Sequence, residues 1–280
     1  MAETWSLADA LDVPLAEHDV MLWWLGQAGF LLRSAGGAVL IDPYLTPLGS
    51  RRFPPPFRAA HAVGVDAVLA THEHGDHLDL DVVRAFVDAD ATATWVVPEP
   101  VAGQLLTLGV AKQRVVSAQP GQRHKLGGLT VQPVAAHHGV TMADAYGTGV
   151  DISGGLVRFL GYVVDMGGTR IYHSGDCLAY PGLAEELKRL AVDVVLLPIN
   201  GRDAEREAHD IVGNMSAEEA VALAAGSGAE VLIPMHWDLF DNNRGYPSQA
   251  VKLVERHHPD LTVLLPSRQR PIGLHRLGRR

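Results

Sequence analysis

The stretch "THEHGDHLD" (residues 71–79) contains three histidines, two aspartates and one glutamate. It directly follows "VDAVLA" (65–70), a short apolar run of the kind that forms a buried strand. Charged and imidazole groups packed this densely at the end of a strand are costly to bury unless something pairs with them. A metal ion is the natural partner, so the stretch predicts a metal site.

Four further polar clusters have the same placement, because each comes directly after an apolar run that reads as a strand. They are His137-His138, His173-Ser174-Gly175-Asp176, Asn200-Gly201-Arg202 and His236-Trp237-Asp238. In layered α/β proteins, the ends of strands and the loops that follow them form the usual binding site. The clusters at equivalent strand ends therefore predict one shared site.

The residue types within 71–79 suit a site for two metal ions. Imidazole and carboxylate groups are good ligands for zinc, manganese or iron. His72 and His74 are separated by one residue, so on an extended segment both can point to the same side. A tight loop at Gly75 would then turn Asp76 and His77 toward a second ion.

Asp176 supplies a carboxylate from a distant segment, and this carboxylate would bridge the two ions. Two ions about 3.5–4 Å apart lower the pKa of a water held between them, so that hydroxide forms near neutral pH. Because Cys177 is the only cysteine, the chain has neither a cysteine-rich zinc site nor an intramolecular disulfide. We expect Cys177 to be a small packing residue rather than a nucleophile.

Other polar residues are expected to have ordinary structural roles. Glu73 is expected to face solvent or to cap a helix. For His173, a structural role and a role beside the metals are equally supported. The remaining histidines are expected to be solvated or hydrogen-bonded side chains: His18, His61, His124, His257, His258 and His275.

The chain has 280 residues, of which 47% are hydrophobic, and a net charge of −9 with neutral histidines. This composition can bury a large core, and the acidic balance argues against a general nucleic-acid-binding surface. The first residues lack the pattern of a signal peptide, and no apolar stretch reaches the roughly 20 residues of a membrane helix. We therefore expect a soluble, cytoplasmic protein with a small-molecule substrate and no nucleic-acid or membrane partner. Self-association into a homo-oligomer stays open.

Hairpin patterns dominate the first part of the chain, and strand–helix alternation dominates the later part. "VMLWWLGQAGFLLRSAGGAVLIDP" (20–43) reads as three strands joined by glycine turns. Further strands are expected at 65–70, 129–136 and 261–266, and helices at 78–89, 181–190, 215–226 and 247–258, with Asp79 or Asp81 near the start of the first helix. No domain boundary is visible, so the pattern predicts one layered α/β domain over residues 1–280 with helices outside the sheets.

The motifs at the strand ends resemble those of the metallo-β-lactamase superfamily. "THEHGDHLD" resembles its H-x-H-x-D-H signature, and Asp42 in "VLIDP" looks like its early aspartate at a strand end. "HSGD" (173–176) resembles its later Gly-Asp motif, and "IPMHW" (233–237) its final histidine. The resemblance covers roughly residues 20–265 and implies a four-layer αββα sandwich with a dinuclear metal site at one edge.

The resemblance also implies which residues bind two divalent transition-metal ions. Zinc and manganese are favoured, and the ligand set also admits iron. The ligands of the first metal would be His72, His74 and His138, those of the second would be Asp76, His77 and His236, and Asp176 would bridge both.

Within the superfamily the chain resembles the L-ascorbate-6-phosphate lactonase-like branch. The stretches that carry this resemblance are "WLGQAGFLL", "HHGVTMADAYG", "PINGRD", "GNMSAEEAVALA" and "IPMHWDLFDNN". It implies a hydrolase in which a metal-bridged hydroxide attacks a lactone or related cyclic ester, phosphorylated or not, while Asp76 orients the hydroxide or carries the proton. Two alternatives stay open: a phosphodiesterase, including one like N-acyl phosphatidylethanolamine phospholipase D, and a non-catalytic metal-binding protein.

Substrate binding is predicted for Asn200 and Arg202, which follow the "VDVVLLPI" strand. The guanidinium of Arg202 would bind an anionic group on the substrate. Two further arginines near the C-terminus, Arg268 and Arg270, are better explained as a solvated basic tail.

The choice between His137 and His138 rests on a weaker pattern. Strand alternation places His138 on the more polar face of 129–136, which favours it slightly as the ligand. The resemblance adds that the ligand of this branch directly precedes a glycine, as in His138-Gly139, and Gly139 would let the chain turn sharply. His137 would then be a neighbour that supports the ligands by hydrogen bonding.

Overall fold

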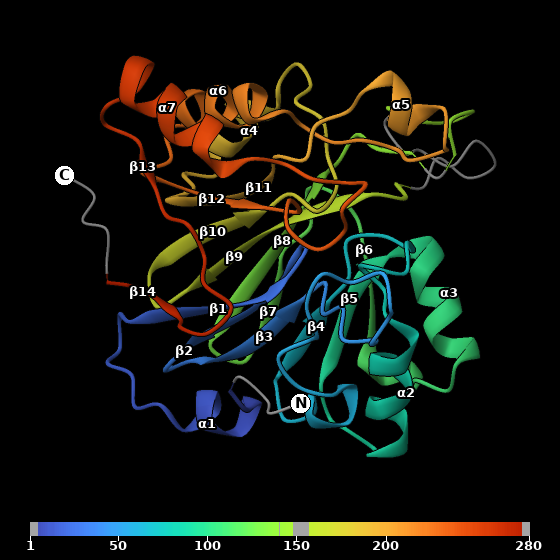
Figure 1. The fold of residues 1–280 in the computed structure, drawn as a ribbon. Coiled ribbons are helices and arrows are strands. Elements are labelled where there is room, and N and C mark those ends of the chain that lie inside the picture. Colours follow the sequence, from blue (N-terminus) through green and yellow to red (C-terminus); the bar gives the residue numbers. More distant parts are fainter. Residues whose placement is uncertain (1–4, 140, 148–156, 276–280) are drawn as a thin grey trace.

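Two mixed β-sheets lie face to face in the middle of the protein, with helices on both outer sides (Figure 1). The computed structural model describes residues 5–139, 141–147 and 157–275. In this part of the chain, the first sheet has the spatial order β14 (Ile272–Leu274), β1 (Val20–Gly26), β2 (Gly29–Ser34), β3 (Gly37–Ile41), β4 (Ala67–Leu69), β5 (Thr94–Pro98) and β6 (Val115–Ala118). The second has the order β13 (Thr262–Val263), β12 (Val231–Met235), β11 (Val194–Pro198), β10 (Thr169–His173), β9 (Leu160–Met166), β8 (Leu129–Ala135) and β7 (His124–Leu126).

The helices cover the outer faces of the two sheets. On the first sheet lie α1 (Leu7–Asp12), α2 (Leu80–Asp88) and α3 (Glu99–Thr107), and on the second lie α4 (Leu183–Arg189), α6 (Ala217–Ser227) and α7 (Pro247–His257) (Figure 1). Shorter helical turns are α5 (Ala204–Glu207), η1 (Ala59–His61) and η2 (Lys112–Arg114).

Buried apolar side chains fill three layers. One core, which includes Phe30 and Tyr162, lies between the sheets. A second, with Val83 and Leu105, joins the first sheet to its helices, and a third, with Leu187, joins the second sheet to its helices. The predicted four-layer αββα sandwich is therefore confirmed.

Strand direction explains why the polar clusters meet. Strands β3 to β6 are mutually parallel, and so are β10 to β13. Strand β8 runs in the direction of β10 because both are antiparallel to β9. Within each sheet, the segments that follow these strands therefore emerge at one end. In the first sheet these segments are Asp42 and 70–77, and in the second they are 136–138, 174–176, 199–202 and 236–238.

Most of the predicted elements are present. Helix α2 starts after Asp79, whose side chain accepts from the backbone N–H of Asp81 at its N-terminus. The strand expected at 261–266 is confined to Thr262–Val263. The short elements that were not predicted include α1, which Ser6 caps, and β14, which pairs antiparallel with β1.

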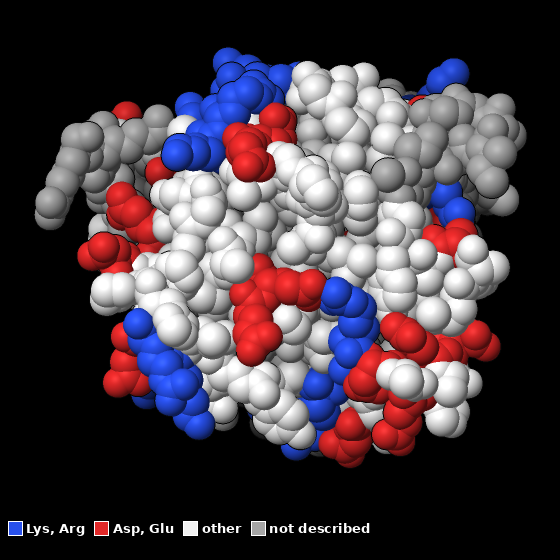
Figure 2. All heavy atoms as spheres, turned by 90° about the horizontal axis from the view of Figure 1, so that it is seen from above, with Lys and Arg blue, Asp and Glu red and all other residues white. Residues whose placement is uncertain are grey.

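The described helices and one face of the surface bear on the expected partners. No helix among the described residues is long and apolar enough to cross a membrane. Figure 2 views the protein from above Figure 1 and shows small groups of charged side chains, in several of which basic and acidic residues lie side by side, on a largely uncharged surface. Cytoplasmic location, homo-oligomer formation and the lack of a nucleic-acid partner stay predictions.

Candidate metal centre

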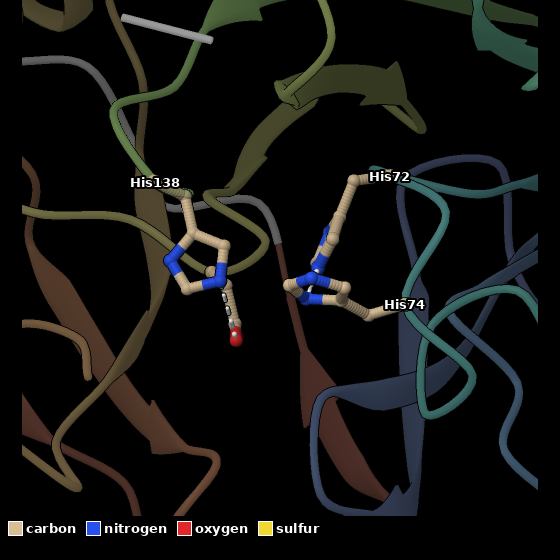
Figure 3. A group of neighbouring side chains, drawn as sticks. His72, His74 and His138 are labelled. Atoms are coloured by element: carbon tan, nitrogen blue, oxygen red, sulfur yellow. Dashed lines mark hydrogen bonds and ion pairs between the residues drawn. The ribbon is translucent and has the colours of Figure 1, made fainter. Parts of the chain in front are cut away.

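Seven side chains from four separate segments converge in two adjoining groups. The first group consists of His72, His74, His138 and Asp176, and the second of Asp76, His77 and His236. Within each group, the ligand atoms all lie within 4.8 Å of one another. Figure 3 shows His72 and His74, from the loop after β4, facing His138, which follows β8 across the gap between the sheets. These are the seven residues that the sequence analysis assigns to the two metals.

The imidazoles of the first group turn ring nitrogens toward one another. His72 Nε2 lies 2.8 Å from His74 Nδ1. The Thr71 hydroxyl, which donates to Asp42, lies 3.0 Å from His72 Nδ1 and can accept its proton, so His72 Nε2 keeps its lone pair. Burial lowers the pKa of His72 well below its ordinary value and that of His138 to about 4. Both are therefore neutral at physiological pH, which is the form that binds a metal.

His77 of the second group is oriented by a buried carboxylate. Its Nδ1 donates to Asp42 Oδ2 at 2.7 Å, which turns Nε2 toward Asp76 and Asp176. Asp42 also accepts from the backbone N–H and the hydroxyl of Thr71. Although burial works against a charged ring, the carboxylates of Asp176, Asp76 and Asp42 raise the pKa of His77 well above its ordinary value.

The carboxylate of Asp176 lies between the two groups. Its Oδ1 is 3.1 Å from His236 Nε2 and 3.3 Å from His77 Nε2, while its Oδ2 is 3.5 Å from His138 Nε2. Burial alone would raise the pKa of Asp176, but His236, His77 and His138 hold it well below its ordinary value. The carboxylate is thus ionised and offers one oxygen to each group, as a bridging ligand requires.

Buried polar atoms without partners indicate that the cluster fits metal ions. Among the described residues, His77 Nε2 and Asp176 Oδ1 are buried and have no hydrogen-bond partner. An unsatisfied buried polar atom costs about 1–3 kcal/mol, and here such atoms converge on one point. A set of imidazole nitrogens and carboxylate oxygens suits zinc, manganese or iron.

The structure separates His137 from His138. His138 belongs to the first group, whereas the ring of His137 stacks on Tyr180 with 3.9 Å between ring centroids. The expected hydrogen bond from His137 to a ligand is thus replaced by ring stacking. Close packing favours glycine at position 139, since a Cβ there would lie 2.2 Å from the Cα of Ala145.

The loop after β4 forms the expected tight turn, but the expectation for Glu73 was wrong. Backbone hydrogen bonds from His77 and Leu78 to the carbonyl of His74 close the turn, but a Cβ on Gly75 would meet no atom within 4 Å. The turn therefore does not require glycine. Glu73 neither faces solvent freely nor caps α2, because it forms an ion pair with Arg158 at 3.1 Å.

Asn200 and Arg202 lie outside both groups and are engaged by other side chains. The Asn200 amide bonds to those of Asn243 and Asn214. Arg202 forms a bidentate ion pair with Glu219, with both N···O distances at 2.7 Å. Substrate binding by these two residues stays a prediction.

The burial and contacts of His173 and Cys177 fit structural roles. His173 is buried, donates from Nε2 to the carbonyl of Ala28 at 2.7 Å, and accepts from the backbone N–H of Gly175 at Nδ1. Cys177 is fully buried in the core beneath α4 and α6, and burial raises the pKa of its thiol to about 12.

Three residues make contacts that were not predicted from the sequence. Gln27 donates from its side-chain amide to Asp76. Asp238 is buried and accepts from Arg268 at 3.1 Å. The guanidinium of Arg268 also lies 3.3 Å from the ring centroid of Phe53, so its prediction as part of a solvated tail was wrong. The exposed Arg270 agrees with that prediction.

Comparison with known sequences gives matches over most of the chain. Residues 38–237 match the family model described as "Beta-lactamase superfamily domain". The chain is 27% identical over 266 residues to the probable L-ascorbate-6-phosphate lactonase UlaG of Salmonella heidelberg, and the match covers 84% of this chain and 74% of that protein.

Solved structures share the fold over nearly the whole chain. A metallo hydrolase from the archaeon Ignicoccus hospitalis superposes with a TM-score of 0.68 at 20% identity, covering 92% of this chain and 99% of the other. An isothiocyanate hydrolase from Delia radicum gut bacteria gives a TM-score of 0.69 at 20% identity, covering 91% and 99%. At this level of identity, both comparisons support the fold.

Proposed function

The chain belongs to the β-lactamase superfamily and is a metal-dependent hydrolase of the metallo-β-lactamase fold; from this premise we propose that it opens a lactone or a related cyclic ester. The observation that carries the proposal is the convergence of seven ligand side chains in two groups that share Asp176. Support for the ester class comes from the relative named as a probable lactonase.

The two groups would each hold one divalent ion, zinc or manganese. The first site would use His72, His74 and His138, and the second Asp76, His77 and His236, with Asp176 contributing to both. When bound, such ions supply Lewis acidity and lower the pKa of water.

Asp76 is the residue that we assign to proton handling. Its side chain is 26% exposed, compared with 7% or less for the carboxylate of Asp176 and the rings of His77 and His236. A substrate can therefore approach Asp76 from solvent. Contacts with His77 and His236 hold the pKa of Asp76 well below its ordinary value, so its carboxylate is ionised and can orient a water molecule by accepting a hydrogen bond from it.

Ring opening of a cyclic ester fits what these residues can do. Attack on the carbonyl develops negative charge on its oxygen, and an electropositive site stabilises that charge. The leaving alkoxide needs a proton, which Asp76 can return after taking it from the attacking water. The same groups could act on a phosphodiester, which is the main competing substrate class.

Substrate screening of the metal-loaded protein tests the proposal. The panel would contain γ- and δ-lactones, phosphorylated sugar lactones and chromogenic phosphodiesters, with Asp76→Asn as the matched inactive control. In the wild type we expect lactone opening, which is measured as the release of acid. In the variant we expect this activity to be lost. Hydrolysis of phosphodiesters without any lactone opening would overturn the assignment.

A further inference from the structure

Gln27 lies in the turn between β1 and β2, directly beside the second metal group. The residue is 2% exposed and has a backbone φ of 53°. Positive φ is uncommon for residues other than glycine. Asp42 and His236 share this feature, with φ of 46° and 57°. Backbone conformations of this kind persist where surrounding contacts enforce them, and they cluster at functional sites.

The side chain of Gln27 contacts two of the proposed ligands of the second metal, Asp76 and His236. Its Nε2 donates to Asp76 Oδ2 at 2.9 Å and lies 3.1 Å from His236 Nε2. These two ligand atoms also lie close to each other, because His236 Nε2 is 3.3 Å from Asp76 Oδ2. One amide group therefore fixes the spacing of two ligands from distant segments.

The backbone of Gln27 holds the second of these ligands as well. Its carbonyl accepts from the backbone N–H of His236 at 3.0 Å and from the indole N–H of Trp24 at 3.1 Å. Its own N–H donates to Asp238 Oδ1 at 3.1 Å. The turn is thus bonded to both ends of the segment 236–238.

Asp238 ties this arrangement to the C-terminal segment. Its Oδ2 accepts from Arg268, whose guanidinium lies over Phe53. Arg268 also lines a cavity with Trp24 and Trp237, two indoles that stack with 5.4 Å between centroids. The turn that carries Gln27 is consequently braced on the side away from the metals.

We propose that Gln27 is a positioning residue that sets the affinity of the second metal site. The inference rests on the proposed function only in that it requires metal ions in the two groups. Gln27 acts through Asp76 and His236, since an amide nitrogen that donates to a carboxylate has no lone pair for a metal. Among the hydrogen bonds of the described residues, none joins Gln27 to His72, His74 or His138, so the first site should not depend on it.

Gln27→Asn is the most informative variant. Asparagine tolerates positive φ and keeps the backbone contacts, but its amide is one methylene too short to reach both ligands. Gln27→Gly, which also tolerates positive φ, serves as a second variant that removes the side chain entirely. Gln104→Asn, on the exposed face of α3, is the matched control for the same chemical change.

The test measures stepwise cobalt(II) or zinc(II) binding to chelator-stripped protein, in competition with a chromophoric chelator. For both Gln27 variants we expect the dissociation constant of the second ion to rise by about 10–100-fold, as removal of a supporting contact does at metal sites. We expect the first ion to bind as in the wild type, with an altered cobalt absorption spectrum confined to the second equivalent. The control should match the wild type in both steps.

Three results would overturn the inference. Unchanged binding of the second ion would show that Gln27 does not position its ligands. Equal weakening of both ions, with a lower melting temperature of the metal-free variants, would assign Gln27 a general structural role. A wild type that binds fewer than two ions would remove this inference together with the proposed metal centre, whereas the first two results leave that centre intact.

Discussion

Asp42→Asn should remove the second metal while leaving the fold in place. Asp42 accepts from the Thr71 N–H through Oδ1 and from His77 Nδ1 through Oδ2. In the variant, the asparagine oxygen must stay on the Thr71 N–H, because that donor needs an acceptor. The amide N–H₂ then faces His77 Nδ1, where an acceptor is now required.

This reversal changes the tautomer of His77. With Nδ1 forced to accept, the ring proton moves to Nε2, the atom that faces Asp76 and Asp176. A protonated nitrogen cannot ligate a metal. In the tautomer that binds a metal, the Nδ1–H of His77 would instead point at the amide N–H₂ of the introduced asparagine.

The magnitude follows from the contact that is lost. A hydrogen bond to a charged group contributes about 1.5–3 kcal/mol, so the metal-free protein should be destabilised by about 2 kcal/mol. At about 2–4 °C per kcal/mol for a chain somewhat smaller than this one, the melting temperature should fall by roughly 4–8 °C. Loss of such a supporting contact should also weaken the second ion by at least about 10–100-fold.

The assay combines thermal unfolding of metal-free protein with stepwise metal titration. Asp193→Asn is the matched control, because Asp193 is also a buried carboxylate that accepts a backbone N–H, but it precedes β11 rather than following a strand at the metal end. The control should lose stability without losing the second ion. If Asp42→Asn binds two ions with wild-type affinity, the tautomer argument is wrong.

Three further predictions address other residues. His138→Ala should lose the first metal while His137→Ala keeps it, because only His138 joins the ligand group; elemental analysis of both variants checks this, and the reverse result would show that the wrong histidine was chosen. Asp76→Ala should lower turnover by at least about 10²-fold and weaken the second ion without unfolding the protein, and near-normal turnover would refute its role. Cys177 should resist alkylation at pH 8 until the chain is unfolded, since burial raises the pKa of its thiol from 9.0 to about 12. The folded state then holds a proton that the unfolded state loses, so this contribution to stability is complete below pH 9 and is lost as pH rises toward 12; rapid labelling of the native protein would contradict it.

The sequence allowed the ligands to be predicted because they are concentrated at strand ends. Apolar runs mark the strands, and parallel strands of one sheet bring their following residues to one edge, so Asp176 and His236 could be placed together from pattern alone. The branch resemblance then favoured His138 over His137, where strand alternation decided little.

Long-range pairing could not be read from the sequence in the same way. Arg202 looked available for a substrate anion, but Glu219 on α6 engages it. Arg268 looked like part of a tail, but its partner Asp238 is 30 residues away in the chain. Gln27 carries no metal-ligand chemistry of its own, and only the folded structure shows that it contacts Asp76. Short edge strands such as β14 also escaped prediction because three residues give no clear alternation.

Metal content of the purified and reconstituted protein tests the central claim most directly. The chain would be purified without chelator, analysed by elemental mass spectrometry, stripped, and reloaded with zinc or manganese. Seven converging ligands in two groups predict roughly two ions per chain, as in other two-metal sites. An Asp176→Ala variant, which lacks the carboxylate shared by both groups, should hold fewer ions than the wild type. Wild-type protein that contains no transition metal and takes up none on reloading would contradict the account.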